Sequence, residues 1–271
     1  MESPTPYPEL NELLRELVRR LLETLGETFV GAYLQGSFAV GDCDENSDVD
    51  FIVAVRDELS EVQVADLQLL HGTVFDLECP WAQHLEGSYF PLEVLRRTAR
   101  AGEALWYLDN GSRSLVRSDH CNTRLVRWVV REMAVTLAGP PPATLVEPIP
   151  VDDLRREIRD VITGWGGEIL AEPDRWRNRF YQGFIALNYA RMLHDLMRGR
   201  AGSKRQGAEW ASRNLDPRWA GLLDRAWATR ADPARSVREP PDPGDYAQTL
   251  EFVRYVMEEC RRYPTARVDV P

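Results

Sequence analysis

Lysine is almost absent from this chain of 271 residues. Of its 33 basic residues only Lys204 is a lysine, and arginine fills every other basic position. The two cations are not equivalent at a phosphate, because lysine carries a compact point charge and arginine a planar fork. One lysine surviving a genomic bias toward arginine is the plain explanation. A contact with phosphate is the alternative, and the position of Lys204 decides between them.

Cysteine and long apolar runs are scarce too. The four cysteines form no C-x-x-C pair and no zinc-type spacing with histidine, which favours reduced structural thiols. No apolar stretch reaches the length of a membrane span, and residues 1–8 lack the basic and apolar regions of a signal peptide. We therefore expect a cytoplasmic protein with no membrane partner.

Positive charge is outnumbered, and the formal net charge is −10. Nucleic-acid binding needs a basic stripe, so this balance argues against a nucleic-acid partner. An acidic cleft would instead concentrate a cationic small molecule. The apolar content of 44% supports a real core, and the length allows two domains.

Residues 35–50 hold the most specific pattern, QGSFAVGDCDENSDVD, directly before the apolar run 51–55. The glycine of the Gly36-Ser37 turn allows close approach to an anion, and consecutive amides there can cradle phosphate. Asp48 and Asp50 are two residues apart, so on a strand they project to one face, where Mg²⁺ suits paired carboxylates. The alternative is a hairpin with solvated aspartates, because these are ordinary turn residues. The full spacing between two apolar segments favours the phosphate and metal interpretation.

This pattern resembles the polymerase-β-like nucleotidyltransferase superfamily, and in particular the aminoglycoside adenylyltransferases of the streptomycin/spectinomycin type. That family has Gly-Ser, then Ser-Asp-x-Asp, a third carboxylate on a later strand, and a helical C-terminal domain, and the resemblance covers most of the chain. It implies an α+β protein. Residues 1–142 would form a nucleotidyltransferase domain with a mixed sheet and helices, and residues 151–271 an all-α helical bundle closing the active-site cleft.

The resemblance implies an antibiotic-resistance enzyme that transfers AMP from Mg-ATP to a hydroxyl of a small molecule, foremost an aminoglycoside, and releases pyrophosphate. Asp48 and Asp50 would hold two Mg²⁺ ions. Glu86 matches the third carboxylate, which is both a metal ligand and the base that deprotonates the acceptor. Glutamate is disfavoured in strands otherwise, although a solvent-facing edge position is the alternative. Asp76 and Glu78 are the rival candidates.

The nucleotide contacts implied by the resemblance come from both halves of the chain. A helix bearing an arginine is followed by a loop lysine and an Ala-rich turn ending in Trp, here Arg191, Lys204 and Gly207 to Trp210. Both cations would reach the ATP phosphates. The expected nucleotide-binding residues are Gly36, Ser37, Ser47, Asn122, Arg191 and Lys204.

The candidates for binding the acceptor lie just ahead of the arginine-bearing helix. They are Trp165, Asp174 and Trp176, but Arg175, Arg177 and Arg179 surround them. Cations disfavour a polycationic drug at that place, so the residues leave the individual drug open.

Two other functions remain open. One is adenylylation of a protein partner by a nucleotidyltransferase-type antitoxin, although such chains are usually short and have a single domain. Arg113 and His120 have the Arg-x6-His spacing of a helical ribonuclease toxin, but a chance match is the simpler explanation. The other is a non-catalytic nucleotide-binding protein, against which the three intact carboxylates argue. We expect a monomer or weak dimer.

Periodicity and turn residues predict the elements of the chain. The segment 139–150 is a proline-rich linker, after which the pattern is helical, with an exposed loop over 231–244. In the first half we expect helices over 8–25, 59–71, 93–106 and 122–137, and strands over 29–34, 50–55 and 83–90, the last one stopped by Pro91.

Overall fold

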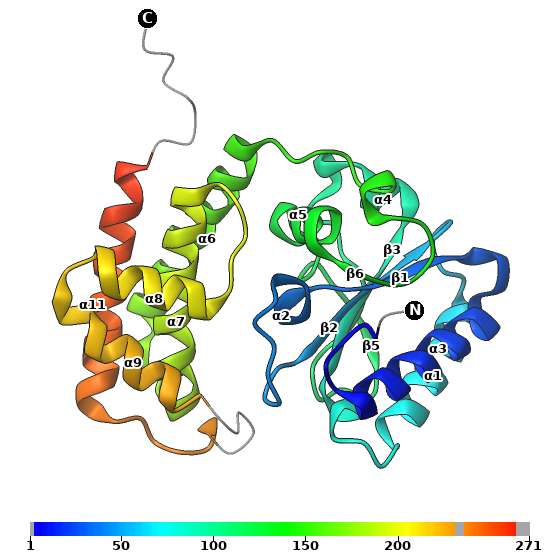
Figure 1. Cartoon of the computed structure of the whole chain (residues 1–271), viewed down its shortest axis with the longest axis horizontal. Coiled ribbons are helices and arrows are strands. Elements are labelled where there is room, and N and C mark those ends of the chain that lie inside the picture. Colours follow the sequence, from blue (N-terminus) through cyan, green and yellow to red (C-terminus); the bar gives the residue numbers. More distant parts are fainter. Residues whose placement is uncertain (1–2, 231–235, 264–271) are drawn as a thin grey trace, which may run out of the picture. The chain divides into compact units, whose positions relative to one another are not determined.

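The computed structural model describes residues 3–230 and 236–263. Contacts between residues divide the chain into two compact units, Met1–Ile149 and Pro150–Pro271 (Figure 1). Each unit has its own buried interior and is described by itself.

The first unit is built on a six-stranded mixed sheet with the order β5-β4-β3-β2-β1-β6. Its two central strands, β2 and β3, are parallel, and all the other neighbours are antiparallel. The bounds are β1 Phe29–Leu34, β2 Val49–Val55, β3 Leu85–Pro91, β4 Leu105–Leu108, β5 Leu115–Ser118 and β6 Val135–Ala138.

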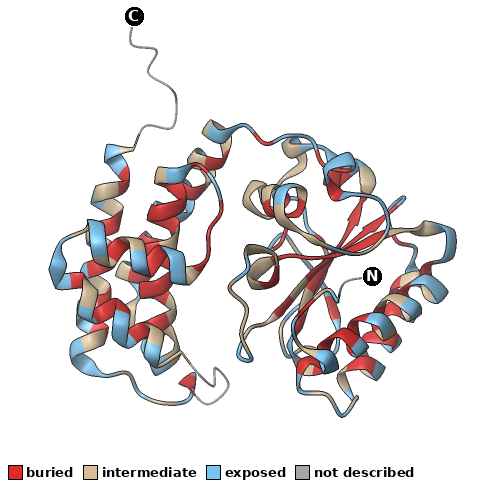
Figure 2. Ribbon diagram, in the orientation of Figure 1, coloured by how far each residue is buried: buried red, intermediate tan, exposed pale blue. Residues whose placement is uncertain are grey.

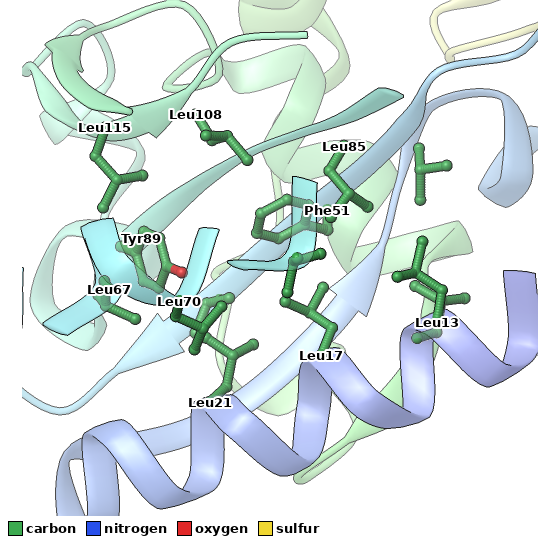
Figure 3. Packing of buried hydrophobic residues seen from close by; sticks show 14 of the residues in the cluster. Leu13, Leu17, Leu21, Phe51, Leu67, Leu70, Leu85, Tyr89, Leu108 and Leu115 are labelled. Carbon is green, nitrogen blue, oxygen red and sulfur yellow. The ribbon is translucent and has the colours of Figure 1, made fainter. Parts of the chain in front are cut away.

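Helices α1 (Pro8–Leu25) and α3 (Glu61–Phe75) pack on one face of this sheet. Proline at the start of α1 has no amide hydrogen to leave unpaired, and Gly26 ends the helix at a positive φ of 51°. Figure 3 shows leucines from successive turns of α1 reaching toward the strands. Because they recur at helical spacing, one stripe of the helix is buried. The labelled ones are Leu13, Leu17 and Leu21.

The alternation along β2 separates the two faces of the sheet. Val49, Phe51, Val53 and Val55 join the core under α1 and α3, and Asp50 points to the other face. That second face meets α5 (Arg124–Met133), whose buried Arg127 lies 5.5 Å from the centroid of the Phe90 ring. The short helices α2 (Gly36–Val40) and α4 (Leu92–Arg96) complete the unit.

Several predicted elements are confirmed. The helix over 8–25 and the strand over 29–34 have the predicted bounds, the strand over 50–55 starts one residue earlier, and the helix over 59–71 is α3, running over 61–75. The expected mixed sheet, followed by helices, is confirmed as the fold class.

Three predicted elements differ from the structure in their bounds or type. The predicted helix over 93–106 is α-helical only where it overlaps α4, Leu92–Arg96, and Leu105–Leu108 is strand β4, whose aromatic residues favour a sheet. The helix over 122–137 ends at Met133, where Ala134 turns to an extended conformation and β6 follows. The third strand begins at Leu85, after a 3-10 turn, and it includes Pro91.

The proline-rich segment 139–150 packs on the first unit. Arg131 donates from Nη1 to the carbonyl of Ala143 at 2.6 Å, and the amide of Glu147 donates to the carbonyl of Arg96 at 3.2 Å. Leu145 and Val146 are buried. The segment is therefore fixed to the first unit by hydrogen bonds to main-chain carbonyls and by its buried side chains.

The second unit is helical, as expected. Its α-helices within the described residues are α6 (Val151–Ala171), α7 (Arg179–Arg198), α8 (Lys204–Asn214), α9 (Ala220–Ala228) and α11 (Pro243–Glu259). Helix α7 contacts all four others and is buried along much of its length (Figure 2). Gly207 lets α8 approach α7 closely, because a Cβ there would overlap the backbone of Arg191.

The predicted loop over 231–244 falls partly outside the described residues, which resume at Ser236; α11 already begins at Pro243, behind Asp242 as its N-cap. Across residues 3–230 and 236–263, every helix is too short or too polar to cross a membrane.

Candidate active site

Asp50 and Glu86 lie side by side on the two parallel strands. The register pairs them directly, so their side chains leave the same face of the sheet. Every other residue of β2 and of β3 is buried, and these two positions alone are half-buried. Charged groups are costly inside a buried sheet, so packing does not explain two carboxylates at paired positions of β2 and β3. Their placement indicates a chemical role instead.

Gly36 packs directly against Asp50. The strand end is joined to β2 by a hydrogen bond from the amide of Gln35 to the carbonyl of Asp50, at 2.9 Å. Gly36 itself has a φ of +59°, and a Cβ at this position would overlap the Oδ2 atom of Asp50. Glycine is therefore required here twice, for its backbone conformation and for the space that the carboxylate occupies.

The serines of the motif differ in their surroundings. The hydroxyl of Ser37 is buried and has no hydrogen-bond partner among the described residues. Such an orphaned polar group is uncommon and is available to a ligand. Ser47 instead closes a turn, because its Oγ accepts a 3.0 Å hydrogen bond from the amide of Asp44.

Glu86 is held in a polar cluster and is 14% exposed. The hydroxyl of Tyr107 lies 2.8 Å from Glu86 Oε1 and 2.9 Å from Asp109 Oδ1, and His120 Nε2 lies 3.4 Å from Glu86 Oε1. Burial, with the two carboxylates, raises the pKa of Tyr107, so its hydroxyl remains a donor. The hydrogen bond to Glu86 raises the pKa of His120.

Asp48 lies just ahead of β2 and receives a hydrogen bond from Asn110. The distance from Asn110 Nδ2 to Asp48 Oδ1 is 2.6 Å. The carboxylate oxygens of Asp48, Asp50 and Glu86 are the hard ligands that Mg²⁺ prefers. Ser37, with its orphaned hydroxyl, directly follows the Gly36 that packs against Asp50. The donor chemistry therefore fits the ion. Among the described residues, however, no three His, Cys, Asp or Glu side chains are gathered as a metal-binding group.

Sequence reasoning missed Tyr107, Asp109 and Asn110, because it extended a helix over 93–106. The dipeptide Asn110-Gly111 was the available signal, since it is typical of a tight hairpin turn. His120 was noticed but was not linked to Glu86.

The rival carboxylate Asp76 lies elsewhere. It is exposed and forms an ion pair with Arg113. Arg113 and His120 thus have different partners, Asp76 and Glu86, so the toxin-like spacing does not correspond to a joint site.

Asn122 is fully buried, and its side chain is hydrogen-bonded to main-chain carbonyls of a neighbouring segment. Its Nδ2 donates to the carbonyls of Arg100, at 3.0 Å, and Glu103, at 2.7 Å, and its Oδ1 has no hydrogen-bond partner among the described residues. These contacts explain its burial, and a nucleotide contact for it stays a prediction.

The cations of the helical unit are partly engaged within that unit. Arg191 on α7 donates from Nη2 to Asn188 Oδ1 at 3.0 Å, while its buried Nε has no hydrogen-bond partner in the described chain. Lys204 is the first residue of α8, and its Nζ lies 4.8 Å from the centroid of the Phe184 ring.

Two of the three acceptor candidates are in contact, and two of the arginines around them have partners. Trp165 and Trp176 meet edge to face with ring centroids 6.0 Å apart. Asp174 is exposed and pairs with Arg177 at 3.4 Å. Arg175 lies over the Trp176 ring at 5.1 Å.

Comparison with known proteins identifies the family of the chain. The family model "Nucleotidyltransferase domain" matches residues 14–97, and "Aminoglycoside adenylyltransferase, C-terminal domain" matches residues 144–259. A spectinomycin 9-adenylyltransferase of Staphylococcus aureus is 26% identical over 223 residues, which cover 75% of this chain and 78% of that protein. An aminoglycoside (3'') (9) adenylyltransferase of Shigella flexneri is 22% identical over 265 residues, 94% of this chain and 96% of that one.

A crystal structure of spectinomycin adenyltransferase AAD(9) from Enterococcus faecialis with ATP and spectinomycin has the same fold. The TM-score is 0.65 at 13% identity, over 92% of this chain and 98% of that chain. The family resemblance drawn from the motifs is confirmed. The chain belongs to the aminoglycoside adenylyltransferases of the streptomycin/spectinomycin type, in the polymerase-β-like nucleotidyltransferase superfamily, and is by family an ATP-dependent O-nucleotidyltransferase.

Proposed function

We propose that this protein transfers AMP from ATP to a hydroxyl of spectinomycin, or of a closely similar aminoglycoside, and releases pyrophosphate. The observation that carries the proposal is the direct pairing of Asp50 with Glu86 on parallel strands, with Gly36 packed against Asp50. The relatives named for spectinomycin support the choice of acceptor.

Glu86 acts as the base. Both of its contacts, with Tyr107 and His120, are made through Oε1, so we assign Oε2 as the atom that receives the proton of the acceptor hydroxyl. The acceptor oxygen forms a bond with the α-phosphorus as the bond from that phosphorus to the bridging oxygen breaks, and pyrophosphate carries away the electron pair. A base placed in this way supplies much of the rate, because the hydroxyl is a weak nucleophile until it is deprotonated.

Asp48, Asp50 and Glu86 would hold two Mg²⁺ ions, which supply neutralisation of charge on the triphosphate when bound. The protein residues around the site position the nucleotide and the acidic side chains. Gly36 keeps the turn close to Asp50, and Ser37 offers a buried hydroxyl to a phosphate oxygen. Ser47 fixes the turn before Asp48. Binding of this kind works by orientation rather than by covalent chemistry.

Lys204 and Arg191 are proposed as phosphate contacts from the helical unit, and Asn122 as a further contact with the nucleotide. Support comes from the Nε of Arg191, which has no hydrogen-bond partner among the residues that the structure describes, and from the place of Lys204 at the start of α8. Trp165, Trp176 and Asp174 would receive the acceptor. Asp174 must then exchange its ion pair with Arg177 for one with the drug.

A screen of pyrophosphate release tests the proposal. The purified chain is incubated with ATP or GTP and Mg²⁺ against spectinomycin, streptomycin and other aminoglycosides. Release with ATP and spectinomycin supports it. If no drug in the panel causes pyrophosphate release although the chain binds ATP, a drug acceptor is rejected and a protein acceptor is favoured. Silence without ATP binding would leave only a non-catalytic role.

A further inference from the structure

The β4–β5 hairpin end, residues 107–111, touches two of the three acidic residues from one side. Strand β4 is antiparallel to β3, and Tyr107 pairs in register with Ser88. Glu86 precedes Ser88 by two residues and therefore lies on the same face, as the diagonal neighbour of Tyr107. The 2.8 Å contact of the Tyr107 hydroxyl with Glu86 Oε1 follows from this register.

Asn110 makes the second contact from the turn of the hairpin. A carboxylate only accepts hydrogen bonds, so Nδ2 must face Asp48, at 2.6 Å, while Oδ1 lies 3.3 Å from His84 Nδ1. The turn is itself anchored, because the amide of Gly111 donates to the carbonyl of Gln83 at 3.1 Å. The positive φ of Gly111, 74°, allows this tight bend.

We propose that Tyr107 and Asn110 are positioning residues for the reaction, which orient Glu86 and Asp48 from a single hairpin; this rests on the proposed function. Both donors are neutral. A neutral donor fixes one carboxylate oxygen and leaves the negative charge for a cation or for the acceptor proton. A lysine or arginine at the same place would neutralise the acid instead.

The two contacts have separable consequences. Tyr107→Phe keeps the ring and removes the hydrogen bond to Glu86, so we expect kcat to fall about tenfold with KM for ATP changed less than about twofold. Asn110→Ala removes the hydrogen bond to Asp48, so we expect the Mg²⁺ concentration for half-maximal rate to rise about tenfold. Asn110→Asp places a like charge against Asp48 and should raise this Mg²⁺ concentration further.

The control is Ser112→Ala in the same turn. The Ser112 hydroxyl is exposed and donates to the carbonyl of Ser114 at 3.0 Å, away from both acids. Wild-type kcat and Mg²⁺ dependence in this variant, with thermal unfolding unchanged in all four variants, would support positioning. Equal losses in Ser112→Ala would show that the fold of the hairpin matters and would overturn the proposal.

A second readout does not depend on turnover. Binding of the non-reactive analogue α,β-methylene-ATP is measured by calorimetry at several Mg²⁺ concentrations. The proposal expects Asn110→Ala to weaken Mg²⁺-dependent binding and Ser112→Ala to leave it unchanged. If the wild-type chain binds the analogue but modifies no acceptor, the proposed function fails and this comparison still decides the role of Asn110. Wild-type behaviour of both Tyr107→Phe and Asn110→Ala, or absence of analogue binding by the wild-type chain, would overturn the inference.

Discussion

Asp50 on β2 and Glu86 on β3 are direct register partners, and both project from the face of the sheet opposite the apolar core. Parallel strands hold this spacing rigidly, since the hydrogen-bond ladder fixes one strand against the other. The catalytic proposal depends on that rigidity, because a base must stay within hydrogen-bond reach of the proton that it abstracts.

Glu86→Gln should lower kcat by about 10²–10⁴-fold, the usual contribution of a general base, because the amide can no longer accept the acceptor proton. The Tyr107 hydroxyl can still donate to the amide oxygen, so thermal stability should be nearly unchanged. The control is Asp76→Asn, at an exposed ion pair with Arg113, which should keep normal turnover. Normal turnover in Glu86→Gln with a large loss in Asp76→Asn would identify Asp76 as the base.

Gly36→Ala should destabilise the fold by about 1–3 kcal/mol and lower kcat at least about 100-fold, through the positive φ and the displaced Asp50 carboxylate. Gly41→Ala is the matched control: it has a φ of +75° but no atom within 4 Å of its Cβ position. Its stability should fall by about 1 kcal/mol, with activity retained. Equal activity losses would show that the overlap with Asp50 is irrelevant.

His120 should stabilise the protein only when it is protonated. Its pKa is raised by the hydrogen bond to Glu86, so the contribution is fully present below the unfolded value of about 6.5 and is lost as pH rises through the higher folded value. His120→Gln should therefore lower the melting temperature at pH 5.5 more than at pH 8.5. The effect should stay below about 1 kcal/mol, since the side chain is largely exposed. A larger loss at high pH would contradict the link to Glu86.

Lys204→Ala should raise KM for ATP about tenfold if its ammonium contacts phosphate. Lys204→Arg should recover only part of the loss, because a planar fork replaces a compact charge. Steady-state kinetics with varied ATP checks this, with Arg213→Ala, an exposed pair with Glu209 on the same helix, as control. An unchanged KM for ATP in Lys204→Ala would reject the phosphate contact and would leave genomic bias as the explanation for the single lysine.

Arg177→Ala should lower KM for spectinomycin by at most about fivefold, because Asp174 is released from an exposed ion pair worth up to about 1 kcal/mol. Asp174→Asn should raise it. Arg156→Ala breaks a similar exposed pair with Asp153 on α6 and serves as control. If Arg177→Ala raises KM, the guanidinium itself contacts the acceptor.

The sequence predicted elements that carry their own local signal. The leucines of α1 repeat at helical spacing between Pro8 and Gly26, and the apolar runs of β1 and β2 are bounded by turn residues, so these bounds were accurate. The Asp50–Glu86 pairing was anticipated only through resemblance, because strand register depends on residues far apart in the chain.

The surroundings of Glu86 could not be read in this way. β4 is four residues long, and in sequence it continues a helical pattern, so Tyr107 was placed beyond a helix end. Its strand character comes from pairing with β3 and β5, a tertiary effect that overrides local propensity. Asn110 and His120 reach the acids only once that hairpin is formed.

The most direct test is mass spectrometry of spectinomycin after incubation with ATP, Mg²⁺ and either the wild-type chain or Asp48→Asn. We expect the wild-type chain to add one AMP to the drug, and Asp48→Asn to leave it unmodified while melting at the same temperature. Unmodified drug with the wild-type chain, or equal modification by Asp48→Asn, would contradict the carboxylate-based nucleotidyl transfer proposed above.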